Sequence, residues 1–189
     1  HSFNVSTFTA RTITSSLSDI HGAITGAIAS LKGPLHGGAN EEVMYMLKKI
    51  KTPSKAKKWI INAIKNKKLV MGFGHRVYKK GDSRVPTMKK YYYKVAEILR
   101  EKNLPKISQA IEEVMIEKKN IHPNVDFPTG PTYHLMGFDT DFFTPIFVIS
   151  RITGWSAHIM EQHAANKLIR PLSKYSGEKH RKVILLNHR

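Results

Sequence analysis

The sequence predicts an all-α protein, and three observations carry this prediction. Apolar residues recur at helical spacing along most of the chain. Proline and glycine punctuate the stretches between these periodic segments. No βαβ pattern, internal repeat or low-complexity linker interrupts them, so we expect several helices joined by short loops and little β structure.

The first two predicted helices are the most regular. One apolar face runs from residue 20 to residue 31, and Gly33-Pro34 ends that helix. Asn40 is a suitable N-cap for the second helix, which continues to about Ile50. Lys48 and Lys49 lie near its C-terminus, where positive charges interact favourably with the helix dipole.

Four further helices follow from the same reasoning. Thr52 and Pro53 predict the N-cap and first position of a helix that runs to about Lys65. The apolar periods of residues 88–99, of residues 107–114 after Pro105, and of residues 144–168 predict the others. Arg170-Pro171 then leads into a tail, in which residues 183–186 are the segment that could form a short strand.

Composition sets limits on function. The 189 residues are 41% hydrophobic, enough to bury a core, and they begin with His1. The chain has no cysteine, which excludes disulfides, cysteine-ligated metals and a thiol nucleophile and is compatible with a reducing compartment. No targeting segment or apolar stretch of membrane-spanning length is visible.

The net charge of +17 predicts an anionic partner, either a polyanion or a phosphorylated and carboxylated small molecule. Many lysines lie within residues 48–68, where interspersed apolar residues indicate a helix with a solvated basic face. The arginines are fewer and scattered at loop edges, an arrangement that suits carboxylate binding better than a nucleic-acid groove.

Four loops combine glycine with polar or charged side chains, and functional residues concentrate in such loops. They are residues 33–40, 71–76, 81–84 and 124–130. In the first loop, His36 precedes a predicted helix whose dipole favours a neutral, hydrogen-bond-donating imidazole, although a histidine that only closes a turn is an equal alternative. His75 follows Gly72-Phe73-Gly74, which lacks the third glycine and the strand–helix context of a dinucleotide-binding fold.

Two charged residues are in unusual surroundings. Asp126 lies between apolar residues and prolines, which predicts a raised pKa and a general base, although most single aspartates serve as turn formers or caps. Arg151 interrupts an apolar helical period and so predicts a buried anion, for which a structural ion pair is the commoner explanation. The spacing of His158 and His163 argues against a metal site, and no Gly-x-Ser-x-Gly elbow indicates a serine hydrolase.

In their order and spacing, the loops resemble the citrate synthase family. The matching segments span nearly the whole chain: residues 1–11 (HSFNVSTFTAR), 33–40 (GPLHGGAN), 71–79 (MGFGHRVYK), 124–130 (NVDFPTG), 151–155 (RITGW) and 169–177 (IRPLSKYSG). The resemblance implies a multi-helical fold with a small domain and part of a large domain. Residues 1–50 would belong to the large domain, 51–140 would form the small, lid-like CoA-binding domain, and 141–189 would return to the large domain and the tail.

The resemblance also implies a reaction. Asp126 would take the α-proton of an acyl-CoA while His36 donates a hydrogen bond to the thioester carbonyl, and His75 would polarise the ketone of oxaloacetate. The condensed thioester would then be hydrolysed to a tricarboxylate and CoA. The CoA thioester is therefore expected as a substrate, with no tightly bound cofactor and no metal.

Further residues take roles from the resemblance. Oxaloacetate would be bound by His1, Arg84, Arg151 and Arg170, with Arg170 reaching the partner's site in a homodimer. The CoA moiety would be bound by Leu69, Val70, Gly72, Phe73, Gly74 and Lys79. Ser6 and Asn124 would support the catalytic groups. Neither a nucleic acid nor a membrane is an expected partner, and the expected location is the cytoplasm, or the mitochondrial matrix in a eukaryote.

Departures from the commonest family pattern point to a particular substrate. The segment Gly81-Asp82-Ser83-Arg84 replaces Asp-Pro-Arg, and Phe-Pro-Thr-Gly follows Asp126 where Phe-Tyr-Ser-Gly is frequent. With residues 133–138 (YHLMGF), these variants resemble 2-methylcitrate synthases, so propionyl-CoA is the favoured substrate and acetyl-CoA, used by ordinary citrate synthases, the alternative. One methylene discriminates by only about 1–3 kcal/mol, so mixed use is plausible.

Two hypotheses from other classes compete. A basic helical nucleic-acid-binding module would explain the charge but leaves the histidine and arginine loops without a role. A catalytically inactive protein with the same fold is disfavoured because each mapped catalytic position holds the expected residue type. Family members carry roughly as much chain again before the position of His1, so we expect the isolated 189-residue chain to expose apolar helix faces and to be poorly soluble or inactive.

Overall fold

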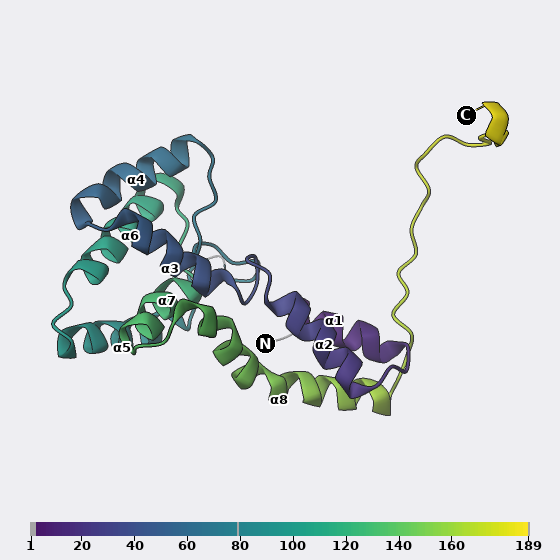
Figure 1. The fold of residues 1–189 in the computed structure, drawn as a ribbon, viewed down its shortest axis with the longest axis horizontal. Helices are drawn as coiled ribbons and strands as arrows, with labels where there is room; N and C mark the ends of the chain where they lie inside the picture. The colour runs from purple at the N-terminus through teal and green to yellow at the C-terminus, as the bar shows by residue number, and fades with distance from the viewer. Residues whose placement is uncertain (1–2, 79, 189) are drawn as a thin grey trace.

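The computed structural model describes residues 3–78 and 80–188, and these contain eight α-helices and two short 3₁₀ helices (Figure 1). The predicted all-α class is confirmed. Within the described residues, β structure is limited to one isolated bridge between Phe73 and Pro123. The α-helices are α1 (Val5–Ser15), α2 (Ile20–Leu31), α3 (Ala39–Ile50), α4 (Pro53–Lys65), α5 (Val85–Ile98), α6 (Asn103–Lys119), α7 (Asp126–Leu135) and α8 (Phe143–Ala164).

The boundaries of α2 and α4 agree with the prediction, whereas other helix ends differ. Helix α3 starts two residues earlier than predicted, with Gly38 as its N-cap, so Asn40 is not a cap but a fully buried residue of the first turn. Helix α6 begins before Pro105, because a proline in the first turn lacks only an N–H that would have no partner within the helix. Helix α8 ends at Ala164, not at residue 168.

Helices α1 and α7 are not predicted from the sequence, because both segments are poor in strong helix formers. Helix α1 is rich in threonine and serine, whose hydroxyls bond back to the helix backbone; the Thr14 hydroxyl, for example, donates to the Ala10 carbonyl at 2.8 Å. Its N-cap is Asn4, whose side-chain oxygen accepts from the backbone N–H of Thr7 at 3.1 Å. Helix α7 contains Pro131, and six of its residues, from Phe127 to Thr132, are buried.

The described part of the tail extends away from the helices (Figure 1). The expected strand at residues 183–186 is absent there; residues 181–185 have no regular structure, and residues 186–188 form a 3₁₀ turn. Strand formation needs a neighbouring strand to supply hydrogen bonds, and the described tail has none beside it. Among the described helices, none combines the length and apolarity needed to cross a bilayer.

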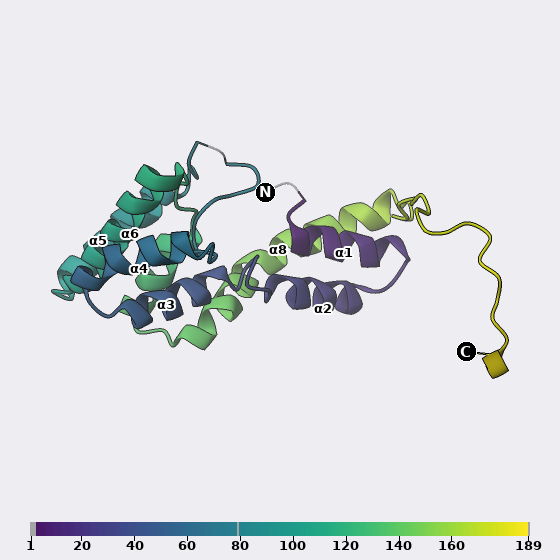
Figure 2. The ribbon, with the colours of Figure 1, turned by 90° about the horizontal axis from the view of Figure 1, so that it is seen from above.

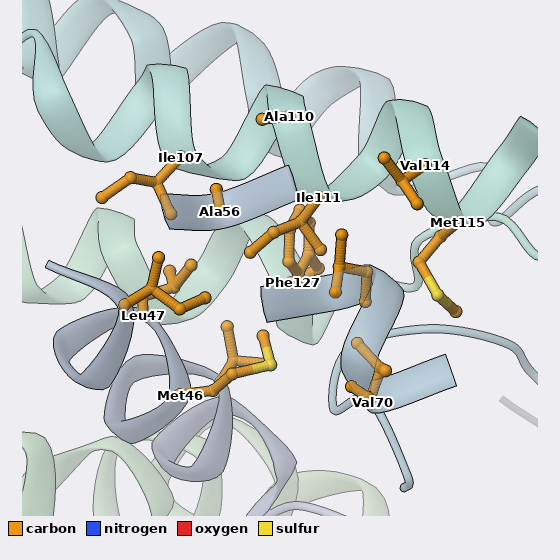
Figure 3. Close-up of a cluster of buried hydrophobic side chains, with 14 of the residues drawn as sticks. Met46, Leu47, Ala56, Val70, Ile107, Ala110, Ile111, Val114, Met115 and Phe127 are labelled. Carbon is orange, nitrogen blue, oxygen red and sulfur yellow. The ribbon is translucent and has the colours of Figure 1, made fainter. Parts of the chain in front are cut away.

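Two groups of buried side chains form the core. The first core cluster joins α3, α4, α6, α7 and the start of α8; in Figure 3, Met46 and Leu47 of α3 lie beneath Ile107 and Ile111 of α6. The second core cluster joins α1, α2 and α8 and consists of Ala10, Ala23, Ala27, Leu31, Trp155 and Ile159. Helix α8 contributes to both clusters and so connects them (Figure 2).

Helix α3 packs in the first core cluster, with Val43, Met44, Leu47 and Ile50 almost fully buried there. The expected domain division at residues 50 and 140 stays a prediction. Helix α3 packs against α4, α6 and α7, which are assigned to the small domain, and also against the start of α8, which is assigned to the large domain.

The close crossing of α3 and α7 gives a test of this packing. A Cβ added at Gly130 would lie 2.7 Å from the backbone oxygen of Asn40, so we expect Gly130→Ala to reduce the free energy of unfolding by about 1–3 kcal/mol. Gly154→Ala is the matched control, since its nearest atom would be at 3.6 Å and alanine favours a helix interior. Equal stability of the two variants in urea denaturation would contradict the crossing.

Candidate active site

A cavity of about 870 Å³ lies where α1 and α8 meet the glycine-rich loops. It brings together side chains from segments far apart in the sequence. Of the site residues expected from the sequence, those that line it are His36, Leu69, Val70, Gly72, Phe73, Gly74, His75, Arg84, Asn124, Asp126 and Arg151. The loops that the sequence singles out therefore surround a single space large enough for a small-molecule substrate.

The remaining expected residues lie elsewhere. Ser6 is buried behind His36, to which it is hydrogen-bonded. Arg170 is exposed on the tail and does not line the cavity. His1 and Lys79 lie outside the described residues, so their assignments stay predictions.

His36 is held in one orientation by Ser6. The backbone N–H of Ser6 donates to His36 Nε2 at 3.2 Å, and the Ser6 hydroxyl lies 2.8 Å from the same nitrogen. Because Nε2 accepts a hydrogen bond, the neutral ring carries its hydrogen on Nδ1. Burial, and then the charge of Arg151, lower the pKa of His36 below its usual value. The expected neutral imidazole is thus supported, with burial and Arg151 as its causes.

Ser6 is in turn hydrogen-bonded to Trp155, to which the sequence analysis assigned no role in the site. The indole N–H of Trp155 donates to the Ser6 hydroxyl at 3.2 Å, and the tryptophan is fully buried in the second core cluster. The Ser6 hydroxyl is therefore held between Trp155 and Asn4, whose Oδ1 accepts from it at 2.9 Å, and Ser6 in turn orients His36.

Asp126 is the first residue of α7, and its pKa is raised, as the sequence predicts. Burial raises the pKa of Asp126 to about 7, Arg84 opposes this shift, and Asp82 reinforces it. The backbone N–H of Asp126 donates to the side-chain oxygen of Asn124 at 3.0 Å. Asn124 also donates from its Nδ2 to the Gly74 carbonyl at 2.9 Å, so it joins the Asp126 segment to the His75 loop. A carboxyl group with a pKa near neutrality suits a general base.

His75 follows a turn in which Gly72 and Gly74 both have positive φ, at 82° and 77°. At Gly72 a Cβ would also lie within 2.9 Å of Val43 and Phe127, so only glycine fits there. His75 Nδ1 accepts from the backbone N–H groups of Val77 and Tyr78 at 3.1 and 3.2 Å. The neutral ring therefore carries its hydrogen on Nε2, which makes that atom a donor.

Of the three arginines that line the cavity, Arg84 and Arg151 are the two expected from the sequence, and they differ in their partners. Arg84 is paired with the buried carboxylate of Asp82, with Nη2 to Oδ2 at 2.7 Å, and lies over the ring of Tyr78. Arg151 lies over the ring of Phe147, and its Nη1 is buried without a hydrogen-bond partner among the described residues. Burial, and then Arg84, lower the pKa of Arg151. Arg151 therefore lines the cavity, and the structural ion pair that was the alternative explanation is not seen among the described residues, so its expected role as an oxaloacetate ligand stays a prediction.

Asp82 is a further site residue that sequence reasoning missed. The available signal was an acidic residue two positions before Arg84 in a glycine-containing loop. A metal is not indicated by the described residues, since they contain no group of three or more potential ligands from His, Cys, Asp and Glu.

Comparisons with known proteins identify the family of the chain. Residues 1–172 match the family model for the citrate synthase C-terminal domain. The chain is 56% identical over 189 residues to 2-methylcitrate synthase 2 of Corynebacterium glutamicum, covering 100% of this chain and 49% of that protein. It is 55% identical over 184 residues to a citrate synthase of Mycolicibacterium smegmatis, covering 97% of this chain and 49% of that protein.

Solved structures give the same result. Citrate synthase of Thermoplasma acidophilum, in a ternary complex with carboxymethyl coenzyme A and oxaloacetate, superposes with a TM-score of 0.91 at 37% identity, covering 100% of this chain and 52% of that chain. Citrate synthase of Thermotoga maritima gives a TM-score of 0.88 at 38% identity, with 100% and 52% covered. The chain spans about half the length of the curated relatives that it matches. On the family match and these relatives, the chain belongs to the citrate synthase family.

Proposed function

We propose that the protein condenses an acyl-CoA thioester with oxaloacetate and hydrolyses the product thioester to a tricarboxylate and CoA. The observation that carries this proposal is the meeting of Asp126, His36 and His75 in one cavity. One of these groups is a carboxyl group with a pKa of about 7, and the other two are histidines whose ring hydrogens are assigned by their partners.

Each group has a step that its chemistry suits. The Asp126 carboxylate removes the α-proton of the acyl group, and the Nδ1–H of His36 donates to the thioester oxygen as negative charge develops there. The α-carbon then forms a bond to the ketone carbon of oxaloacetate as the C=O π bond opens, and the ketone oxygen receives a hydrogen bond from the Nε2–H of His75. This oxygen takes up one proton to become a hydroxyl, which balances the proton that Asp126 removed. Water finally cleaves the C–S bond, which releases the CoA thiol and a carboxylate.

Arg84 and Arg151 bind the carboxylates of oxaloacetate in this proposal. The support comes from Arg151, because a buried guanidinium nitrogen with no partner among the described residues is costly unless an anion binds there. We assign the loop at Leu69, Val70, Gly72, Phe73 and Gly74 to the CoA moiety, since it lines the same cavity. His1 and Lys79, and Arg170 in a homodimer, keep the roles that the family resemblance implies.

Propionyl-CoA is the favoured acyl donor. A 2-methylcitrate synthase is 56% identical to this chain and a citrate synthase 55% identical, so identity alone does not separate the two substrates. The sequence variants at residues 81–84, 126–130 and 133–138 support the methylcitrate assignment. Neither the matching family model nor these relatives and solved structures support the alternative of a nucleic-acid-binding module.

The test is oxaloacetate-dependent release of CoA thiol by the full-length protein, measured with propionyl-CoA and with acetyl-CoA. We expect release with both, and a larger kcat/KM for propionyl-CoA by up to roughly 10²-fold, the range that one methylene allows. A larger value for acetyl-CoA would assign the protein as an ordinary citrate synthase. Folded protein that releases no thiol from either substrate would contradict the condensation itself.

A further inference from the structure

The carboxylate of Asp82 joins two parts of the cavity that are far apart in the sequence. Its Oδ1 accepts from the backbone N–H and the Nε of Arg84 at 3.0 and 2.9 Å. Its Oδ2 accepts from Arg84 Nη2 at 2.7 Å and from the backbone N–H of Val125 at 3.1 Å. Val125 is the N-cap residue of α7 and directly precedes Asp126. One carboxylate therefore contacts both the substrate arginine and the segment that carries the base.

This carboxylate is buried, and its charge is balanced by Arg84. The side chain of Asp82 is 1% exposed, whereas that of Arg84 is 32% exposed and lines the cavity. Burial alone would raise the pKa of Asp82, but the hydrogen bonds from Arg84 and Val125 hold it below the usual value. The hydrogen bond to Asp82 likewise raises the pKa of Arg84. Asp82 and Arg84 thus form a fixed, charged pair beside Asp126.

We propose that Asp82 is a positioning residue: it orients Arg84 toward the cavity, anchors the start of α7, and offsets the positive charge that Asp126 would otherwise experience. Asp82 does not line the cavity, so it acts through Arg84 and Val125 and not by touching substrate. This inference rests on the proposed function, because a positioning role needs a reaction to serve. Its test, a pKa measurement without substrate, does not depend on that function.

The electrostatic part of the proposal has a definite sign. Arg84 lowers the pKa of Asp126, and Asp82 raises it. Removing the Asp82 charge therefore lowers the pKa of Asp126 through two effects. Asp126 loses a negative neighbour, and the positive charge of Arg84 is no longer neutralised by Asp82. The titratable or charged groups that interact with Asp126 or line the same cavity are Asp82, Arg84, Tyr133, His36, His75, Arg76, Tyr78 and Arg151.

Asp82→Asn is the informative substitution. Asparagine has nearly the same shape, and its side-chain oxygen can still accept from Val125, but its amide NH₂ then faces the donors of Arg84. We expect the pKa of Asp126, followed by ¹³C NMR of aspartate-labelled full-length protein without substrate, to fall from about 7 by roughly one unit or more. Asp126→Asn assigns the resonance, and Asp139→Asn, at an exposed position outside the cavity, is the control.

A second variant separates charge from loosening. The double variant combines Asp82→Asn with Arg84→Gln. If Asp82→Asn lowers the pKa of Asp126 only by letting water reach it, that pKa stays low in the double variant as well. If the unbalanced Arg84 charge is the cause, the double variant returns the pKa toward that of the original protein. An unchanged pKa in Asp82→Asn, or a low pKa in both variants, would overturn the inference.

These measurements need no turnover, so they are independent of the thiol-release assay. A restored pKa in the double variant with no thiol release by the original protein would leave the inference standing and remove the proposed function. Normal thiol release by the original protein with an unchanged pKa of Asp126 in Asp82→Asn would support the proposed function and overturn the inference.

Discussion

Replacing Asp126 with asparagine is expected to lower the rate of CoA release by a factor on the order of 10²–10⁴, because the amide cannot accept the α-proton. The original protein should show a rate that rises with pH through about 7, where Asp126 loses its proton. The variant should lose this rise as well as the rate. Rates of thiol release between about pH 5 and pH 9 measure both effects.

Asp139→Asn is the matched control, since this aspartate is exposed and lies outside the cavity. It should keep both the rate and the pH dependence. An Asp126→Asn variant that retains more than about a tenth of the rate would show that another group is the base. A pH dependence that survives the substitution would assign the titration to another group.

Asp126→Asn, which is expected to lower the rate, is also expected to raise the stability of the folded protein above about pH 7. The pKa of Asp126 is about 7 in the folded protein and close to 3.8 when the chain unfolds. The folded state therefore binds more protons between these values, and the free energy of unfolding falls as pH rises from about 4 to about 7. Asparagine carries no charge at any pH, so Asp126→Asn should be more stable than the original protein above about pH 7 and should lack this dependence. Urea denaturation on either side of the folded-state pKa, at about pH 5 and about pH 8, tests the sign.

Arg151→Met is expected to weaken oxaloacetate binding and to stabilise the protein at once. Loss of a charge-assisted hydrogen bond to a carboxylate lowers affinity by a factor on the order of 10². In the absence of ligand, however, the buried Nη1 has no partner among the described residues. Replacing it with an apolar side chain of similar length should therefore raise the free energy of unfolding by roughly 1 kcal/mol. Few residues combine these two effects unless they serve a ligand.

Thermal unfolding with and without oxaloacetate measures both effects. The ligand should raise the Tm of the original protein and leave that of Arg151→Met nearly unchanged, while the variant without ligand unfolds at a Tm higher by roughly 2–4 °C. Arg181→Met, on the exposed tail, should alter neither value by more than about a degree. A destabilised Arg151→Met variant would indicate a structural role for this arginine.

Much of the fold could be predicted where the determinants are local. The apolar period of α2 and the Thr52-Pro53 start of α4 locate these helices correctly, because side-chain spacing and first-turn proline act within one segment. Helices α1 and α7 could not be predicted, because their hydroxyl side chains and internal Pro131 disfavour a helix until neighbouring helices bury it.

The candidate site divides in the same way. The sequence alone predicted which loops line the cavity, that Asp126 has a raised pKa, and that Arg151 is out of place in an apolar helix. Only the tertiary structure decided that burial and Arg151 favour a neutral His36, that Trp155 and Ser6 orient it, and that Asp82 balances Arg84 beside Asp126. The physical reason is that spacing and turn chemistry are properties of a segment. Burial and the distance between charges depend instead on residues that are remote in sequence and meet only when the chain folds.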